Sequence, residues 1–261
     1  MSESNDIIIR VKDLRVGYGE RVILENVNFE VRRGEVVVIL GRSGSGKSTL
    51  LKSMIGLNRP FSGEVSIMGK DLFGTNGDEH QELLRSFGVL YQSGALFGSM
   101  TVLENVRLPL DEFTDLPLEA RNLIALGKLR LVGLGNSPGA MPAALSGGMQ
   151  TRAALARAMA LDPKILFLDE PSVGLDPVTS ASLDQLILQL ARAFNITFVI
   201  VSHEMESIYE VASRAIMVDD HARTVIAEGK PCDLRDRSTD PRVRQFFHRE
   251  AEEEIHQTQT E

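Results

Sequence analysis

Three short stretches of the chain are apolar almost throughout, namely Val36–Leu40, Ile165–Leu168 and Thr197–Val201. A strand that helices cover on both faces has no polar side, so its sequence shows a continuous apolar run instead of alternation. These stretches therefore predict the central strands of a mostly parallel core sheet.

Other stretches mix β-branched and polar residues in alternation, between Gly and charged turns. They are Ile7–Val11, Val22–Val31 and Gly63–Gly69. Such alternation is typical of strands with one buried face and one solvent-exposed face. We expect them to form an antiparallel β layer beside the core sheet, in an α/β fold.

Helical spacing of apolar residues predicts three helices, Thr49–Leu57, Gly147–Leu161 and Val178–Phe194. The second is rich in Ala and stops before an Asp-Pro pair, and the third begins after another such pair. Pro is favoured in the first turn of a helix and cannot continue one, so these boundaries agree with its chemistry.

Composition limits the possible partners. The net charge of −8 gives no electrostatic reason to expect binding to nucleic acid or to an anionic membrane surface. The apolar runs are far shorter than the ~20 residues that span a bilayer, and no signal peptide is recognised, so contact with a membrane is expected through partners. The single cysteine, Cys232, excludes an intrachain disulfide and fits the cytosol.

A glycine-rich motif links the first core strand to the first helix. Gly41–Ser48 satisfies the pattern G-x-x-x-x-G-K-[ST], in which backbone N–H groups and the helix N-terminus bind phosphate oxygens. Lys47 is expected to reach the β- and γ-phosphates of ATP, and Ser48 to ligate Mg²⁺. The expected nucleotide-binding residues of this region are Gly41, Ser43, Gly44, Gly46, Lys47, Ser48 and Thr49.

Four further residues stand at the ends of predicted strands. Asp169 can hold Mg²⁺, and Glu170 can orient or deprotonate the attacking water. Gln92, which follows a strand predicted at Val89–Tyr91, could ligate the metal and sense the γ-phosphate, and His203 could donate to the γ-phosphate. Taken singly, His203 fits an ordinary structural role as well as a catalytic one. The expected catalytic residues are Lys47, Gln92, Glu170 and His203, and the expected metal ligands are Ser48, Gln92 and Asp169.

The stretch Leu145–Met149 begins the second predicted helix. Ser146 fits the N-cap position, so its hydroxyl and the N–H groups of Gly147 and Gly148 would form an anion site. Considered alone, the stretch also fits a capped helix without a ligand.

Together, these motifs resemble the nucleotide-binding subunit of ABC transporters. The set is Gly41–Ser48, Gln92, Leu145–Met149, Ile165–Glu170, Ser172–Asp176 and His203, in this order over about residues 5 to 235. The resemblance implies an ABC-type P-loop NTPase fold with ATP held between two copies of the chain. It further implies that Tyr18 stacks on adenine, that Ser146, Gly147 and Gly148 contact the opposite subunit's γ-phosphate, and that Asp176 links the two sites. Met149 departs from the Gln most common at that position.

Two short stretches are similar to the ATPase of MCE-type (Mla) phospholipid transport systems. They are Tyr91–Phe97 and Asp240–Phe246, and Met149 agrees with them. The resemblance implies lipid transport between bacterial membranes and maintenance of outer-membrane lipid asymmetry. The implied partners are a membrane permease and an MCE-domain lipid-binding protein. The implied location is cytoplasmic, on the inner face of the inner membrane.

Other functions stay open at this point. A transporter for another substrate, such as an amino acid, would share every ATP-binding residue. An ABC ATPase that acts on DNA or ribosomes fits less well, because the chain lacks a long coiled-coil insertion, a second cassette and a basic tract. A small-molecule P-loop kinase would leave Leu145–Met149 and His203 unexplained.

Three parts are expected along the chain. Residues 1–92 and 156–235 form a nucleotide-binding, RecA-like core with the antiparallel layer, and residues 93–155 form a helical subdomain. Residues 236–261 are an extension beyond this fold, with an acidic tail from Arg249. Because Val243, Phe246 and Phe247 recur at helical spacing in it, we expect this segment to dock on a partner or on the second copy.

Overall fold

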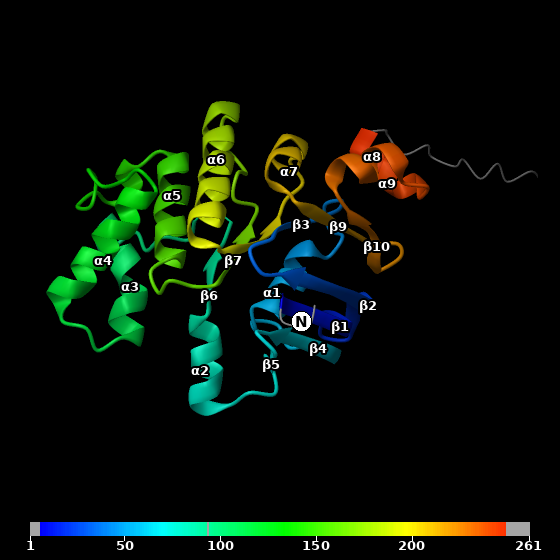
Figure 1. Ribbon diagram of the computed structural model, residues 1–261, viewed down its shortest axis with the longest axis horizontal. Coiled ribbons are helices and arrows are strands. Elements are labelled where there is room, and N and C mark those ends of the chain that lie inside the picture. The colour runs from blue at the N-terminus through cyan, green and yellow to red at the C-terminus, as the bar shows by residue number, and fades with distance from the viewer. Residues whose placement is uncertain (1–5, 93, 249–261) are drawn as a thin grey trace, which may run out of the picture.

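Two sheets organise the chain (Figure 1). The computed structural model describes residues 6–92 and 94–248. The larger sheet has six strands in the order β10-β9-β3-β8-β7-β6, all parallel except β10. These strands are β3 (Val36–Leu40), β6 (Phe87–Leu90), β7 (Ile165–Asp169), β8 (Thr197–Val201), β9 (Arg214–Asp219) and β10 (Thr224–Gly229). The predicted mostly parallel core sheet is confirmed.

The smaller sheet is antiparallel and has the order β2-β1-β4-β5. Its strands are β1 (Ile7–Tyr18), β2 (Arg21–Arg32), β4 (Ser62–Ile67) and β5 (Lys70–Asp71). Strand β1 continues well past the predicted end at Val11. The register of β1 against β2 shifts between Val11 and Leu14, and Asp13 there has a φ of 47°, so the strand passes through a bulge and resumes.

Each core strand serves two hydrophobic clusters. Along β3, Val37 and Ile39 join the cluster between the two sheets, whereas the alternate residues face the cluster under the helices. Helix α1 (Lys47–Met54) contacts strands of both sheets. Helices α6 (Pro177–Phe194) and α7 (Met205–Val211) cover the other face (Figure 1). Burial on both faces explains the continuous apolar runs.

A group of helices lies at one end of the molecule (Figure 1). It contains α3 (Val102–Phe113), α4 (Leu118–Leu131) and α5 (Gly147–Ala158), with a short 3-10 helix at Pro142–Ala144. Within the described residues 94–155 there is no strand. Helix α2 (Gly77–Arg85) precedes β6. Helix α3 starts at a capping box, in which the backbone N–H of Glu104 donates to Thr101 Oγ1 and the Glu104 carboxylate accepts from Thr101 N.

The C-terminal region differs from expectation. Helix α8 (Pro231–Arg237) crosses the expected boundary at residue 235, and helix α9 (Pro241–His248) follows it. Val243 and Phe247 of α9 are 0% and 5% exposed within the chain's own core. The expectation that these apolar residues lie beyond the fold and serve a partner is therefore wrong for Val243 and Phe247. The acidic tail from Arg249 lies outside the described residues.

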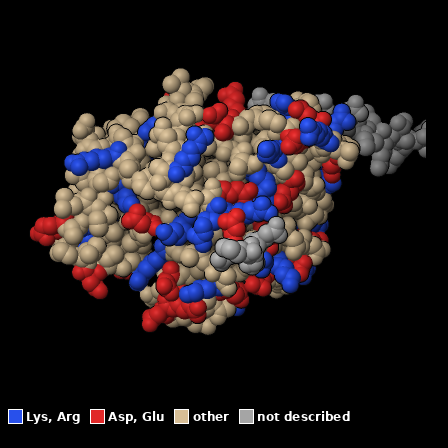
Figure 2. All heavy atoms as spheres, viewed as in Figure 1, with Lys and Arg blue, Asp and Glu red and all other residues tan. Residues whose placement is uncertain are grey.

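The surface shows no concentration of basic residues in the view of Figure 2, where acidic and basic side chains are interspersed. Few charged side chains are visible over the α3–α5 end of this face (Figure 2). Over residues 6–92 and 94–248, no helix is long and apolar enough to cross a bilayer.

Candidate functional site

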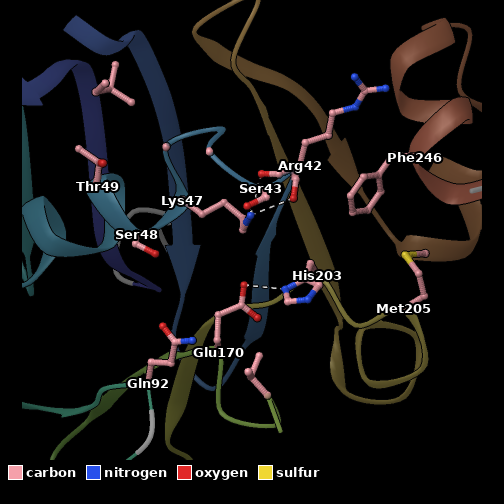
Figure 3. Close-up of a pocket in the computed structure, with 15 residues that line it drawn as sticks. Arg42, Ser43, Lys47, Ser48, Thr49, Gln92, Glu170, His203, Met205 and Phe246 are labelled. Carbon is pink, nitrogen blue, oxygen red and sulfur yellow. Dashed lines mark hydrogen bonds and ion pairs between the residues drawn. The ribbon is translucent and has the colours of Figure 1, made fainter. Parts of the chain in front are cut away.

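The loop Gly41–Gly46 between β3 and α1 curls around the ammonium group of Lys47. Lys47 Nζ donates to the carbonyls of Gly41 and Arg42, both at 2.9 Å (Figure 3). Gly46 has a φ of 97°, and a Cβ there would lie 2.9 Å from side-chain atoms of Ile23 and Leu24. Only glycine fits such a position, which holds the start of α1 close to β2.

The environment of Lys47 suits an anion. Burial lowers the pKa of Lys47 below its ordinary value, while the negative charges of Glu170 and Asp169 act in the opposite direction. The Lys47 ammonium group donates to two neutral carbonyls beside the N-terminus of α1. A phosphate that replaced those carbonyls would pair with the ammonium charge and with the N-terminus of α1.

The hydroxyl of Ser48 and the carboxylate of Asp169 are close together beside the phosphate-binding loop. Ser48 Oγ lies 3.3 Å from Asp169 Oδ1, at the end of β7. Burial raises the pKa of Asp169, and the Ser48 hydrogen bond opposes that rise. Carbonyl, carboxylate and hydroxyl oxygens are the ligands that Mg²⁺ accepts, usually together with phosphate and water. In the described part of the chain no group of three or more His, Cys, Asp or Glu residues is placed to hold a metal ion.

Glu170 and His203 form a pair across the ends of β7 and β8. His203 Nδ1 lies 2.8 Å from Glu170 Oε1 (Figure 3). The second carboxylate oxygen, Glu170 Oε2, is buried and has no protein partner. One oxygen is thus fixed by the imidazole and the other can accept a proton from water. The backbone of Glu170 has a φ of 50°, in the left-handed region.

A cavity of about 650 Å³ brings these groups together. The expected site residues that line it are Gly41, Ser43, Gly44, Gly46, Lys47, Ser48, Thr49, Gln92, Glu170 and His203. Five residues that sequence reasoning did not assign also line it, namely Ile23, Arg42, Val173, Met205 and Phe246 (Figure 3). Arg42 and Val173 stood inside recognised motifs, whereas Phe246 was expected to dock on a partner or on the second copy and instead lines this cavity.

Tyr18 lies outside this cavity, at the end of β1, with half of its surface exposed. Asp169 does not line the cavity and contacts it through its hydrogen bond with Ser48. The remaining expected residues, Ser146, Gly147, Gly148 and Asp176, do not line the cavity either.

The start of α5 is exposed to solvent. Ser146 Oγ accepts from Met149 N at 3.3 Å, which is the expected N-cap, and both Ser146 and Gly147 are exposed. Gly148 is buried against Thr179 of α6. This helix start is therefore separate from the Lys47 cavity.

Asp176 caps the neighbouring helix α6. Its Oδ1 accepts from Val178 N and Thr179 N, both at 3.1 Å, and its Oδ2 accepts from Thr179 Oγ1 at 2.5 Å. The hydrogen bonds from Thr179, led by its hydroxyl, lower the pKa of Asp176. The cap therefore fixes Thr179 in contact with Gly148 and links α6 to the start of α5.

Comparisons with known proteins agree with this geometry. The ABC transporter family profile matches residues 24–173. The intermembrane phospholipid transport system ATP-binding protein MlaF of Haemophilus influenzae is 42% identical over 95% of this chain and 93% of that relative. The probable ribonucleotide transport ATP-binding protein mkl of Mycobacterium leprae is 41% identical over 93% of this chain and 69% of that relative. A dimeric ATP-binding cassette solved in a post-hydrolysis state with ADP and Pi has a TM-score of 0.76 and 34% identity, over 85% of this chain and 98% of that chain.

Proposed function

The chain belongs to the ABC transporter family and is an ATPase, and on that premise we propose that its transporter moves phospholipid between bacterial membranes. The observation that carries the mechanism is the separation of the exposed Ser146–Gly147 surface from the Lys47 cavity. One copy holds a phosphate-binding loop without an opposing helix start, and a second copy would supply it.

A symmetric dimer would bring the Ser146–Gly147 surface of each copy against the Lys47 cavity of the other. A two-fold axis that places Ser146 and Gly147 of one copy over the Lys47 loop of the other creates two equivalent composite sites. Tyr18, exposed at the end of β1, would stack on the adenine. Asp176 would link the sites, because the helix that it caps packs on Gly148.

In this proposal, different side chains of the chain activate the attacking water and hold the metal ion. Glu170 accepts a proton from the attacking water at its unpartnered Oε2, and His203 holds the other oxygen. Ser48 and Gln92 would hold Mg²⁺, with Asp169 behind Ser48. When bound, that ion would supply positive charge that offsets the negative charge of the phosphates. Loss of the γ-phosphate removes contacts to both copies, so the closed dimer opens.

A mostly apolar groove of about 580 Å³ gives the membrane partner a place to dock. Its walls come from β6, α3 and α5, and include Phe97, which is 51% exposed. Arg157 on α5 donates to the carbonyls of Gly94 and Ala95, both at 2.9 Å. The loop after Gln92 is thus tied to the helix that begins at Ser146.

The occupant that we propose for this groove is a cytoplasmic helix of the membrane permease. Such a helix would move the loop that carries Gln92 together with α5, so movement in the membrane would be coupled to both nucleotide-binding surfaces. The chain would then be peripheral on the cytoplasmic face of the inner membrane. An MCE-domain lipid-binding protein would be a further member of the complex.

Phe97→Glu tests the groove. Burying a charged group at a docking surface is costly, so this variant is expected to lose the permease on purification while ADP binding by the isolated chain is retained. Phe194→Glu is the matched control, because Phe194 is also 51% exposed but lies at the end of α6. Equal permease recovery with both variants would reject the groove as the docking site.

The substrate is tested by isolating complexes from native membranes through this chain. We expect a polytopic permease, an MCE-domain protein and an enrichment in phospholipid. The relative named for ribonucleotide transport makes that substrate class the principal alternative, with amino acids another. The phospholipid proposal would be overturned if the permease came without lipid enrichment and together with a protein that binds a water-soluble substrate. The assignment of the chain as an ATPase would still stand.

A further inference from the structure

The C-terminal helix α9 reaches the mouth of the nucleotide cavity. Phe246 is one of the lining residues, and its ring lies on the same side of the cavity as Arg42 and Met205 (Figure 3). Gln245, the preceding residue, is 203 positions from Arg42 in the sequence, and Arg42 Nη2 donates to Gln245 Oε1 at 2.8 Å. The last described helix thus contacts the phosphate-binding loop of its own chain.

Helix α9 is firmly attached to the core. Phe247 packs on Tyr209 of α7 with ring centroids 6.2 Å apart, and Val243 is fully buried. Arg242 Nη1 lies 3.0 Å from Asp219 Oδ1, and the Asp219 carboxylate at the end of β9 is 5% exposed. A helix held by burial and by an ion pair at a buried carboxylate is a fixed support for what it contacts.

The phosphate-binding loop has two kinds of hydrogen bond, and only one of them can persist when nucleotide binds. Before binding, Lys47 Nζ holds the carbonyls of Gly41 and Arg42. To reach the phosphates of ATP, the ammonium group must leave these carbonyls, and the first turn of the loop loses both hydrogen bonds. The Arg42 side chain points away from Lys47 (Figure 3), so its hydrogen bond to Gln245 can persist throughout.

We propose that Gln245 is a positioning residue for nucleotide binding, which holds the phosphate-binding loop in its binding conformation through Arg42. Helix α9 is by this assignment part of the ATP site of its own chain. The role is independent of the transported substrate. It acts on the bound state of the loop, so it governs affinity more than the rate of the chemical step.

Three substitutions in α9 test the assignment on the full-length chain. Gln245→Ala removes the acceptor, Gln245→Glu keeps one, and Arg244→Ala changes the neighbouring exposed residue as a control. We expect Gln245→Ala to weaken Mg-ADP binding and raise the KM for ATP by about tenfold, the scale of one hydrogen bond to a charged group, with kcat within about twofold. Gln245→Glu and Arg244→Ala should match the wild type.

A double-mutant cycle shows whether the effect passes through Arg42. In an Arg42→Ala background the further change Gln245→Ala should weaken Mg-ADP binding much less than it does in the wild-type background, because the contact between these two side chains is already lost. The proposal is overturned if Gln245→Ala binds Mg-ADP like the wild type, if Gln245→Glu is as weak as Gln245→Ala, or if the two substitutions at Arg42 and Gln245 are additive. Thermal unfolding of each variant shows whether the substitution has impaired folding. If Gln245→Ala is impaired, the Mg-ADP affinity of Gln245→Glu relative to the wild type tests the proposal instead.

Discussion

The two glycines at the start of α5 differ in the space around them, and this difference predicts opposite outcomes for the same substitution. A Cβ on Gly148 would lie 2.3 Å from Thr179 Cγ2, whereas the nearest atom to a Cβ on Gly147 is Leu175 Cδ2 at 3.5 Å. Non-bonded carbon atoms are comfortable at about 3.5–4.0 Å. Gly148→Ala must therefore displace Thr179, or separate α5 from α6, by at least about 1.2 Å.

Thr179 cannot turn aside cheaply. Its N–H and its hydroxyl both donate to the Asp176 carboxylate, so a new rotamer would break part of the cap of α6. Overpacking that cannot relax costs about 1–3 kcal/mol. In a chain of this size each kcal/mol lowers the Tm by about 2–4 °C, so Gly148→Ala should lower it by about 4–8 °C for a loss near 2 kcal/mol.

Thermal unfolding without nucleotide measures this directly. Gly147→Ala should unfold close to the wild-type temperature, since its methyl group finds ordinary contact distances. Combining Gly148→Ala with Thr179→Ser should recover most of the loss, because Ser keeps the hydroxyl that bonds to Asp176 and lacks the clashing methyl group.

The ATPase rate separates folding from function in the same set. Gly147→Ala places a methyl group on the exposed surface that we propose faces the second copy's nucleotide, so it should lose activity without losing stability. Equal Tm values for Gly147→Ala and Gly148→Ala, or no recovery in the Thr179→Ser double variant, would refute the steric argument.

Three further predictions follow from the site and its surroundings. Glu170→Gln should bind ATP but hydrolyse it about 10²- to 10⁴-fold more slowly, with closed dimers accumulating on gel filtration; near-normal turnover would remove Glu170 from its role. Ser146→Arg and Lys47→Ala should each abolish ATPase activity, and enforced heterodimers of the two should regain one working site; no recovery would contradict the composite site. Asp184 is 4% exposed and accepts from Ser207 Oγ at 2.6 Å, and burial raises its pKa, so its ionisation destabilises the fold as the pH rises above about 4. Asp184→Asn should therefore be more stable than the wild type at pH 7 and no different below about pH 4, as measured by urea unfolding at both pH values.

The sequence predicted the centre of the fold better than its edges. Strands β3 and β8 end where their apolar runs end, because burial on both faces leaves no polar position to blur the boundary. Strand β1 was predicted too short, since the bulge at Asp13 interrupts the alternation. Strand β9 was not predicted, because a short apolar run with a charged start does not distinguish a strand from a buried helix segment.

The sequence also predicted some residues of the site and not others. Residues of the phosphate-binding loop are contiguous in sequence, so their motif was enough to place them. The contact between Arg42 and Gln245 joins positions 203 apart and follows from the packing of α9, for which neither residue carries a signal. The apolar spacing of Val243 and Phe247 predicted a helix correctly but could not say that the surface it covers belongs to the same chain.

The left-handed backbone of Glu170 implies a conflict between stability and activity at a single position. Holding a non-glycine residue at a φ of 50° costs about 1–2 kcal/mol, and a buried oxygen without a partner adds to that cost. Glycine would relieve both costs and would remove the carboxylate that we propose takes the proton from water. A library selected for thermal stability alone should therefore drift away from glutamate here, so this position gives an internal marker of whether selection has kept function.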